Sequence, residues 1–282
     1  MLARPTIDRR EVQTLLAHTL GVTRAGIIAH PERILDAPQT QLALTLIARR
    51  AAGEPIAYLI GVREFYGRDF NVSPATLIPR PETELLVEQA LARLSVTFAL
   101  EKPANAGSAH FPTKHAASVL DLGTGSGAIA VSIALEHPHA CVVAVDTSRA
   151  ALAIATENAR RLGAAVEFIE SDWFENLYGR RFDLIVTNPP YVAGADEHLI
   201  QGDLRYEPLA ALTDNSDDGL DSIRTIIAGA RTHLNAGGSL LFEHGYDQAV
   251  TCRELLLKAG FEGLTSVTDL AGIPRVAGGQ IR

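Results

Sequence analysis

Several residue types are scarce in this sequence, and each shortage excludes a class of protein. Its 282 residues include only two cysteines, Cys141 and Cys252, which cannot form a disulfide framework. No cysteine–histidine cluster has the spacing of a zinc site. No run approaches the roughly 18 apolar residues of a membrane span, and the N-terminal stretch MLARPTIDRREVQ has no apolar core for a signal peptide. We expect a cytoplasmic protein without a metal site, whose cysteines are buried or inert thiols.

Positive charge is also scarce. Lysine and arginine total 25 against 33 aspartates and glutamates, so the formal net charge is -8. Because a general nucleic-acid-binding protein normally presents a basic face, this balance argues against that class, although it leaves room for a local basic patch. The rest of the composition, 47% hydrophobic and 21% charged, is ordinary for a globular protein. The length suits one large domain or two smaller ones.

The N-terminal third carries helical patterns and one hairpin pattern. Over residues 8–52, REVQTLLAHTLG and QTQLALTLIARRAAG place apolar residues at helical spacing and stop at glycine. REFYGRDFNVS alternates aromatic residues around Gly67 and predicts a hairpin. A further helix begins in IPRPETELLVEQALARL, where Pro81 suits a first helical turn. Residues 95–117 are rich in Ala, Ser, Pro and Gly without a period, which predicts a mobile connector.

After the connector, strand and helix patterns alternate. The apolar strands SVLDLG, ACVVAVD and FDLIVTN are separated by helical stretches such as GAIAVSIALEH and RAALAIATENARRLG. Further along, SIRTIIAGARTHLNAGG predicts a helix that is followed by the strand SLLFEHG. Alternation of this kind predicts an α/β fold with a mostly parallel sheet and helices on both faces. Ligands of such sheets bind beyond the carboxyl ends of the strands. The turns after Leu122 and Thr187 both follow strands, so we expect them to share one crevice.

The first of these turns, DLGTGSGAIA, has the features of a nucleoside-binding site. Gly123, Gly125 and Gly127 allow a sharp turn and a close approach of the backbone to a ligand. The helix that follows offers free N–H groups. Asp146 ends the next strand, where a carboxylate can accept both hydroxyls of a ribose. Strand, turn, helix and acid together predict a nucleoside-type cofactor.

Two features favour S-adenosylmethionine over a dinucleotide, although Gly123, Gly125 and Ala128 also satisfy the pattern G-x-G-x-x-A. Asp121 precedes the first glycine and places a carboxylate where a sulfonium or ammonium group needs one. The second feature is the stretch VTNPPYVAG. A hydride-transfer enzyme has no evident use for its Asn-Pro-Pro-Tyr turn, whereas a methyltransferase that modifies amino groups does.

That turn can hold a planar NH2 group. Prolines cannot extend a central strand, so the chain stops pairing at Asn188 and forms a stiff turn. The Asn188 side-chain oxygen and the Pro189 carbonyl can accept the two N–H hydrogens of the target, while Tyr191 packs against the flat group. Orientation and electrostatic preorganisation, rather than base catalysis, then prepare a poor nitrogen nucleophile for transfer.

Residues 119–282 resemble a class I S-adenosylmethionine-dependent methyltransferase, and the whole chain closely resembles the release-factor glutamine methyltransferases. The turn NPPY alone is shared with adenine-N6 methyltransferases, so the set of motifs makes the resemblance specific. The matching stretches are EPIAYLIGVREFYGRDFNV, LIPRPETE, DLGTGSGAIA, NPPY, YEPLAAL, DGLDSI and FEHGYDQ.

The resemblance implies a Rossmann-like, seven-stranded, mostly parallel methyltransferase sheet with a small helical N-terminal domain and a β-hairpin linker. It places the recognition domain and hairpin in residues 1–75, a helix and connector in 76–118, and the methyltransferase domain in 119–282. It also implies methylation of the side-chain nitrogen (N5) of glutamine in the Gly-Gly-Gln motif of class 1 peptide chain release factors. The cofactor is S-adenosyl-L-methionine, with S-adenosyl-L-homocysteine as product. We expect a monomer without direct nucleic-acid or membrane contacts.

The resemblance assigns site residues by position. The expected cofactor-binding residues are Asp121, Gly123, Thr124, Gly125, Ser126, Gly127, Asp146, Trp173 and Asn188. The expected catalytic residues are Asn188, Pro189 and Tyr191. The expected substrate-binding residues are Asn188, Pro189, Pro190 and Tyr191.

Three alternative functions remain open. A glutamine methyltransferase acting on a ribosomal protein would share every catalytic residue. An adenine-N6 nucleic-acid methyltransferase would add a basic recognition region, which a net charge of -8 disfavours. A non-catalytic cofactor-binding module would not require the intact Asn-Pro-Pro-Tyr turn.

Five further features have readings of their own. Asp172 either accepts the adenine amine or caps a turn. Glu243 and His244 end a strand at the expected crevice, where hydrogen-bonded structural roles are as plausible as functional ones. Arg80 reads as a surface charge. Gly278-Gly279-Gln280 reproduces the substrate tripeptide, and we interpret it as a strand end with two permissive glycines.

Overall fold

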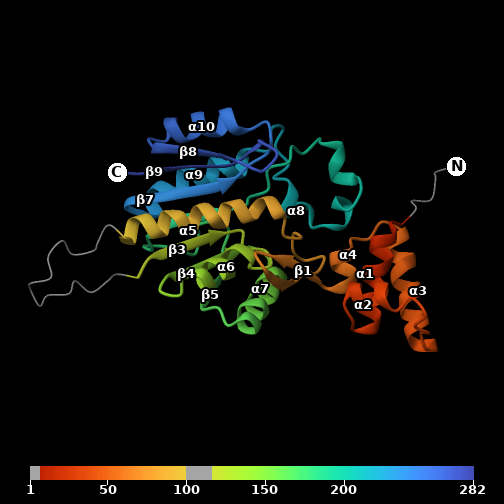
Figure 1. The fold of residues 1–282 in the computed structure, drawn as a ribbon. Coiled ribbons are helices and arrows are strands. Elements are labelled where there is room, and N and C mark those ends of the chain that lie inside the picture. The colour runs from red at the N-terminus through yellow and green to blue at the C-terminus, as the bar shows by residue number, and fades with distance from the viewer. Residues whose placement is uncertain (1–6, 100–115) are drawn as a thin grey trace, which may run out of the picture.

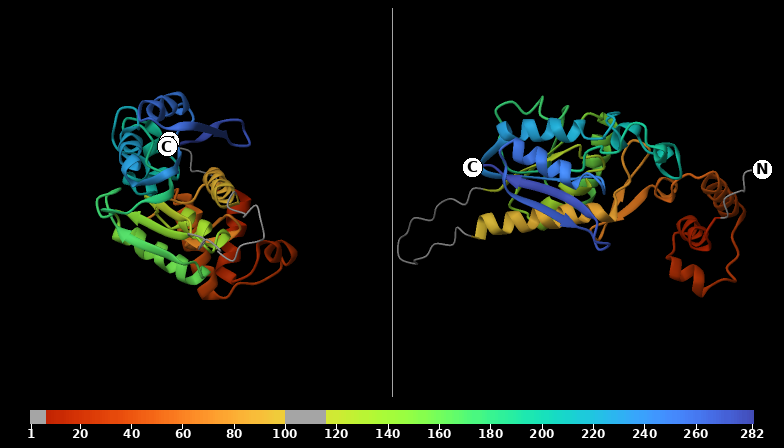
Figure 2. Two further views of the ribbon diagram at one scale, coloured as in Figure 1. Left: turned by 90° about the vertical axis from the view of Figure 1, so that its left-hand side faces the viewer. Right: turned by 90° about the horizontal axis from the view of Figure 1, so that it is seen from above.

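The computed structural model describes residues 7–99 and 116–282 and contains a small helical unit beside a larger sheet domain (Figure 1). The helical unit consists of α1 (Arg9–Leu20), α2 (Arg24–Ala29), α3 (Ala37–Ala51) and α4 (Ile56–Ile60). Its own small core contains Leu15, Leu46 and Leu59. The helical patterns of residues 8–52 are confirmed. The unit lies beyond one end of the sheet, as the view from above also shows (Figure 2, right).

The predicted hairpin is present and belongs to the packing of the sheet domain. Strands β1 (Val62–Phe65) and β2 (Arg68–Asn71) pair antiparallel. Their turn has positive φ at both Tyr66 and Gly67, the requirement of a type I′ turn. Phe65 and Phe70 are buried in the core cluster of the large sheet. The hairpin is therefore anchored on the sheet domain and carries the helical unit.

A buried asparagine connects this hairpin to the glycine-rich turn. Asn158 of α7 (Arg149–Leu162) accepts the Asn71 N–H at 2.8 Å and donates to Asn71 O at 3.0 Å, as a paired strand would. Its Nδ2 atom also donates to Ser126 O at 2.9 Å. One side chain thus holds the hairpin against the turn expected to bind the cofactor.

The large sheet has seven strands in the order β5-β4-β3-β6-β7-β9-β8, and β9 runs opposite to all the others. The predicted Rossmann-like, mostly parallel sheet is confirmed. Because the last strand of the chain lies between β7 and β8, the β8–β9 hairpin joins the sheet through β9. The strands are β3 (Ser118–Leu122), β4 (Cys141–Asp146), β5 (Val166–Glu170), β6 (Phe182–Thr187), β7 (Leu234–Glu243), β8 (Glu262–Thr268) and β9 (Pro274–Gln280).

Helices cover both faces of this sheet, as the alternation predicted (Figure 1). On one face, α5 (Glu84–Ala99), α6 (Ala128–Glu136) and α7 share a core with one set of alternating strand residues. On the other face, α9 (Asp221–His233) and α10 (Ala249–Lys258) pack on the alternate set. Short helices form the connections, namely η1 (Pro81–Thr83), η2 (Glu197–Ile200), η3 (Leu204–Tyr206) and α8 (Leu209–Leu212).

Two predicted boundaries are wrong. We expected the helix of SIRTIIAGARTHLNAGG to extend to Gly238, but α9 ends at His233 and β7 already begins at Leu234. Positive φ at Gly237 and a register shift opposite Phe182 and Leu184 let an irregular strand follow the helix. The connector was expected from residue 95, yet residues 95–99 still belong to α5. The rest of it, residues 100–115, lies outside the described residues.

The cysteines differ in environment. Cys252 is buried in α10, where burial raises the pKa of its thiol to about 12, as expected for an inert thiol. Cys141 is exposed at the start of β4, so it is not a buried thiol, and its inertness stays a prediction. Within residues 7–99 and 116–282, no helix is long and apolar enough to cross a membrane. The same residues contain no group of three or more His, Cys, Asp or Glu side chains arranged to hold a metal ion.

Candidate active site

The glycine-rich turn between β3 and α6 is tight because its glycines adopt positive φ angles. These are +68° at Gly123, +56° at Gly125 and +81° at Gly127, a region that residues with side chains rarely adopt. A hydrogen bond from Gly127 N to Thr124 O, at 2.9 Å, closes the turn. A Cβ atom on Gly127 would lie 3.1 Å from Ala155 Cβ, whereas one on Gly125 would meet no atom within 4 Å. Gly127 therefore serves close packing, and Gly125 borders open space.

Asp121 is a fully buried carboxylate with one unsatisfied oxygen. Its Oδ2 atom accepts hydrogen bonds from Thr124 Oγ1 at 2.6 Å and from Ala130 N at 3.2 Å. Its Oδ1 atom has no hydrogen-bond partner within the described part of the chain. Burial raises the pKa of Asp121 to about 7; the two hydrogen bonds oppose this shift, and the charge of Asp146 adds to it. Such a group is suited to receive a cation or a hydrogen-bond donor.

Asp146 and the turn are joined directly. The Asp146 carboxylate, at the end of β4, accepts hydrogen bonds from Gly125 N and Ser148 N, both at 2.9 Å. Each carboxylate oxygen has further acceptor capacity. The structure thus brings Asp146 to the open side of the glycine-rich turn, as the sequence predicted.

Trp173 borders the same turn. It follows β5 with a positive φ of +43°, and its ring packs on the core cluster beneath α9 and α10. Ring atom Cζ3 lies 3.7 Å from the position that a Cβ on Gly123 would occupy. Asp172 is exposed, and its backbone carbonyl accepts the Glu175 N–H at 3.0 Å.

The Asn-Pro-Pro-Tyr turn leaves the sheet next to the glycine-rich turn. Leu122 of β3 pairs in register with Thr187 of β6, so Gly123 and Asn188 leave adjoining strands at the same level. The two turns expected to share one crevice are therefore adjacent.

A chain of hydrogen bonds connects both ends of this turn. Asn188 Nδ2 donates to Thr83 Oγ1 at 3.2 Å, and Thr83 Oγ1 donates to Glu243 Oε2 at 2.7 Å. The Tyr191 hydroxyl donates to Glu243 Oε1 at 3.0 Å. No donor from the described residues contacts Asn188 Oδ1. Glu243 thus has a hydrogen-bonded role beside the turn, and Thr83 is a member that the sequence reasoning did not single out.

The surroundings of these hydrogen-bonded residues change the pKa values of two of them. Burial raises the pKa of the Glu243 carboxyl, against the lowering effect of the hydroxyl donors and of Arg275, while Glu82 raises it further. Burial and the charge of Glu243 raise the pKa of Tyr191 well above its ordinary value. Tyr191 is therefore a neutral donor, which holds its ring in a fixed orientation.

The outer side of the turn is held by the loop before α9 and by the start of α10. Gln248 Nε2 donates to Tyr191 O at 2.9 Å and to Asp218 O at 3.0 Å. A Cβ on Gly219 would lie 2.2 Å from Tyr191 O, so only glycine fits beside the turn. Gln248 and Gly219 lie in the stretches FEHGYDQ and DGLDSI, and those motifs were the only sequence signal for them.

Comparison with known proteins decides the family. Residues 3–61 match the PrmC N-terminal domain, and residues 104–204 match the methyltransferase small domain. A release factor glutamine methyltransferase of Burkholderia pseudomallei is 49% identical over 288 residues, covering 100% of this chain and 95% of that protein. The Escherichia coli protein of the same name is 43% identical over 273 residues, covering 96% and 92%. The chain belongs to the release factor glutamine methyltransferase family.

A solved structure supports the fold of this family member. A methyltransferase from Pyrococcus furiosus aligns with a TM-score of 0.54 at 15% identity, covering 84% of this chain and 98% of that one. At this identity the likeness concerns the fold alone.

Arg80 of the methyltransferase is not a surface charge, and that expectation is wrong. Its guanidinium forms an ion pair with Glu207, whose side chain is fully buried and also accepts the Ile78 N–H at 2.9 Å. A buried carboxylate requires such partners. The pair ties the segment before η1, which leads to Thr83, to the segment after η3.

The segment around η3 also contacts the helical unit. Arg50 Nη1 lies 2.8 Å from Asp203 Oδ1, and the Tyr206 hydroxyl donates to Ala52 O at 2.8 Å. The N-terminal helices of the enzyme are thus attached to the η3 segment, which lies beside Glu207 in the sequence.

His244 follows Glu243 and is fully buried. Its Nδ1 atom lies 2.8 Å from Gly245 O, and its Nε2 atom has no hydrogen-bond partner within the described residues. Burial lowers the pKa of His244, so the ring is neutral and donates through Nδ1. The described contacts give it a structural place behind the turn.

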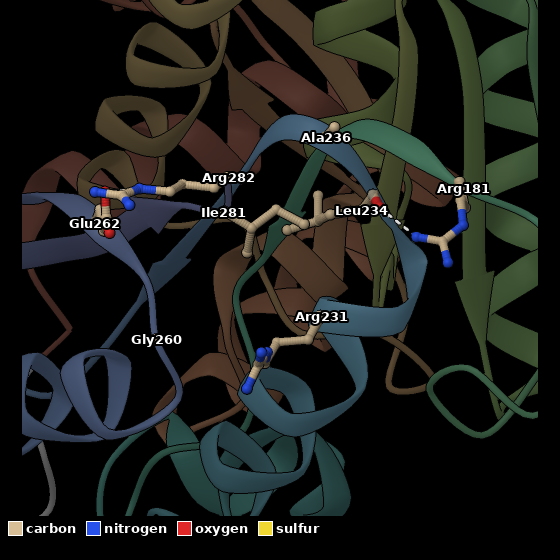
Figure 3. Close-up of a pocket in the computed structure, with 8 residues that line it drawn as sticks. All are labelled: Arg181, Arg231, Leu234, Ala236, Gly260, Glu262, Ile281 and Arg282. Carbon is tan, nitrogen blue, oxygen red and sulfur yellow. Dashed lines mark hydrogen bonds and ion pairs between the residues drawn. The ribbon is translucent and has the colours of Figure 1, made fainter.

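One hollow of about 380 Å³ lies at the opposite end of the parallel strands, near the start of β7 (Figure 3). Its three arginines, Arg181, Arg231 and Arg282, point away from one another. Arg181 donates to Leu234 O at 2.8 Å. The hollow is therefore separate from the crevice and has no convergent set of groups.

The tripeptide Gly278-Gly279-Gln280 also lies at this end of the sheet. Gln280 pairs in register with Ser239, and its Nε2 atom donates to Gly237 O at 2.5 Å. A Cβ on Gly278 would lie 2.3 Å from Leu240 O. The interpretation as a strand end is confirmed, and the glycines serve close packing.

Proposed function

We propose that this chain methylates the side-chain nitrogen N5 of the glutamine in the Gly-Gly-Gln motif of class 1 peptide chain release factors. The observation that carries the proposal is the orientation of Asn188. Its amide nitrogen is directed to Thr83, and its oxygen remains available to accept an N–H from an incoming NH2 group. Full-length similarity to proteins named for this reaction supports the choice of substrate.

The residues around the glycine-rich turn fit S-adenosylmethionine. The unsatisfied Asp121 oxygen suits a cationic group, and Gly125 borders open space. Asp146 retains acceptor capacity for ribose hydroxyls, and the Trp173 ring offers a flat apolar surface for adenine. The residues that would hold the cofactor are Asp121, Gly123, Thr124, Gly125, Ser126, Gly127, Asp146, Trp173 and Asn188.

Within this set, two residues act by shaping the turn. The Thr124 hydroxyl is used by Asp121, and Ser126 is buried with its carbonyl bound to Asn158. When bound, the cofactor supplies an electrophilic methyl group on a sulfonium.

The protein then orients the nucleophile. Asn188 Oδ1 accepts one N–H of the glutamine amide and the Pro189 carbonyl accepts the other, while Pro190 keeps that carbonyl in place. The Tyr191 ring packs against the flat amide. These contacts direct the nitrogen lone pair and stabilise the positive charge that develops on the NH2 group. No base is needed before transfer, because the proton can leave after methylation.

The division of labour is part of the proposal. The domain of residues 1–75 recognises the body of the release factor, residues 76–118 connect, and residues 119–282 carry out the transfer. We propose that the enzyme acts as a cytoplasmic monomer without direct nucleic-acid contacts, because its substrate is a protein of the translation machinery.

The test is mass spectrometry of an unmethylated class 1 release factor incubated with this protein and S-adenosylmethionine. We expect one added methyl group on the Gly-Gly-Gln glutamine and none elsewhere. Absence of transfer, with the cofactor still bound in calorimetry, would refute the substrate and direct the search to ribosomal proteins.

Asp121 should make cofactor binding depend on pH. Its pKa of about 7 in the free protein means that the carboxyl is protonated below pH 7 and must lose that proton to hold a cation. We expect affinity for S-adenosylmethionine to fall by about tenfold for each pH unit below 7. Calorimetry at pH 8, 7 and 6 measures this change.

A matched pair of variants provides the control. Asp121→Asn should bind weakly at pH 8 and lose the pH dependence. Asp172→Asn, which alters an exposed aspartate beside Trp173, should keep the slope. Equal affinities of the unmodified protein at pH 8 and pH 6 would show that Asp121 does not contact the cation.

A further inference from the structure

Three residues from distant parts of the chain meet at the amide of Asn188. Thr83 lies in η1, Asn188 follows β6, and Glu243 ends β7. Thr83 lies 105 residues before Asn188 and 160 residues before Glu243, yet one hydrogen bond joins it to each of them. Thr83 is 4% exposed and Glu243 1% exposed, so water does not compete for these bonds.

Glu243 determines which group donates and which accepts in each of these hydrogen bonds. The hydroxyl donors Thr83 and Tyr191, with Arg275, favour the ionised form of Glu243 against its burial. In that form the carboxylate only accepts, and its two oxygens receive the hydroxyl hydrogens of Thr83 and Tyr191. Thr83 has a single hydroxyl hydrogen, which is then used. Toward Asn188 the Thr83 oxygen can only accept, so it must face the NH2 end of the amide.

We infer that Thr83 and Glu243 are positioning residues that fix the Asn188 amide with its oxygen toward the substrate. This inference rests on the proposed function and specifies what prepares its central residue. The two ends of an asparagine amide have nearly the same shape, so packing alone does not distinguish them. A hydrogen-bond partner of fixed polarity does.

The orientation matters because the glutamine NH2 group, which the site must hold, carries only hydrogen-bond donors. A reversed Asn188 would present its own NH2 group to that NH2 group, and neither would be satisfied. Tyr191 shares the acceptor Glu243, so the same carboxylate fixes the amide and the aromatic ring of the pocket. Loss of Thr83 should therefore lower the transfer rate without altering the glycine-rich turn that faces the cofactor.

The test compares two substitutions of Thr83 in the full-length protein. Thr83→Val keeps the shape but removes the hydroxyl, and we expect the single-turnover rate with a release factor to fall by about tenfold to a hundredfold. Thr83→Ser keeps the hydroxyl and should restore the rate to within about threefold. Affinity for S-adenosylmethionine, measured by calorimetry, should fall much less than the rate in Thr83→Val, because the glycine-rich turn and Asp146 are untouched.

A second comparison shows whether Thr83 acts through Asn188. In an Asn188→Ala background, Thr83→Val should cause no further loss of rate, because no amide remains to be oriented. A further tenfold loss in that background would overturn the inference. So would a Thr83→Val protein that is as fast as the unmodified one.

A spectroscopic measurement keeps this test independent of the proposed substrate. In protein labelled with nitrogen-15 at asparagine, the side-chain NH2 signals of Asn188 are identified by their loss in Asn188→Ala. We expect Thr83→Val to shift these signals and Thr83→Ser to preserve them. If the unmodified protein does not methylate the release factor but this shift occurs, the proposed substrate fails and the positioning role stands. Unshifted signals in Thr83→Val would overturn that role whatever the substrate.

Discussion

Asn188→Ala is expected to lower the rate of methyl transfer to a release factor by roughly 10² to 10⁴. The side chain supplies one of two acceptors that hold the glutamine NH2 group, and the remaining Pro189 carbonyl leaves that group free to rotate about a single hydrogen bond. The fold should persist, because Asn188 is half-buried and gives up one bond to Thr83. Single-turnover kinetics with mass-spectrometric detection measure the effect.

The control for this variant is an asparagine at the opposite end of the parallel strands. Asn235 also donates one side-chain hydrogen bond, to Asp183 Oδ1 at 2.7 Å, but it lies at the start of β7. Asn235→Ala should leave the rate unchanged. A nearly normal rate for Asn188→Ala would contradict the role assigned to the turn. A loss of cofactor affinity as large as the loss of rate would show that Asn188 serves the cofactor instead.

Removal of residues 1–53 is expected to separate protein recognition from chemistry. We predict that kcat/KM for a release factor falls by about a hundredfold or more, because a three-residue loop offers too little buried surface for affinity. Methylation of a short Gly-Gly-Gln peptide and cofactor affinity should change by no more than about threefold. Parallel assays on protein and peptide substrates measure the two quantities.

The position of the cut follows from the packing of the hairpin. A deletion of residues 1–75 would also remove Phe65 and Phe70, which are buried in the core of the sheet domain. Cutting after Gly53 removes α1 to α3 and keeps this core intact. Equal losses with protein and peptide substrates would mean that the helical unit supports the crevice rather than binding the partner. An undiminished kcat/KM for the protein would place recognition in the sheet domain.

The features that could be predicted from sequence are those set by the local backbone. The glycine-rich turn and the Asn-Pro-Pro-Tyr turn each consist of adjacent residues whose conformational limits mark the end of a strand. Alternating apolar patterns on either side gave the order of strands and helices. The position of both turns at the carboxyl ends of neighbouring strands then followed from the geometry of parallel sheets.

The features that could not be predicted depend on partners far apart in the chain. Thr83 and Glu243 are 160 residues apart, and Arg80 is 127 residues from Glu207. No local pattern shows that a threonine after a proline completes a hydrogen-bond chain. The missed boundary between α9 and β7 has a different cause, since LNAGG suits a helix end and an irregular strand equally well.

The strand order of the sheet constrains the path by which the enzyme folds. Strand β8 is made before β9, yet it contacts the sheet only through β9, so β8 has no strand partner until β9 has formed. The two strands are joined by a short link, so their pairing is the most local strand contact at this edge of the sheet. Asp269 organises the link between them by accepting hydrogen bonds from Ala271 N at 2.9 Å and Ile273 N at 3.0 Å. This turn lies outside the catalytic apparatus, so we expect substitutions of Asp269 to alter the formation of the hairpin without altering methyl transfer.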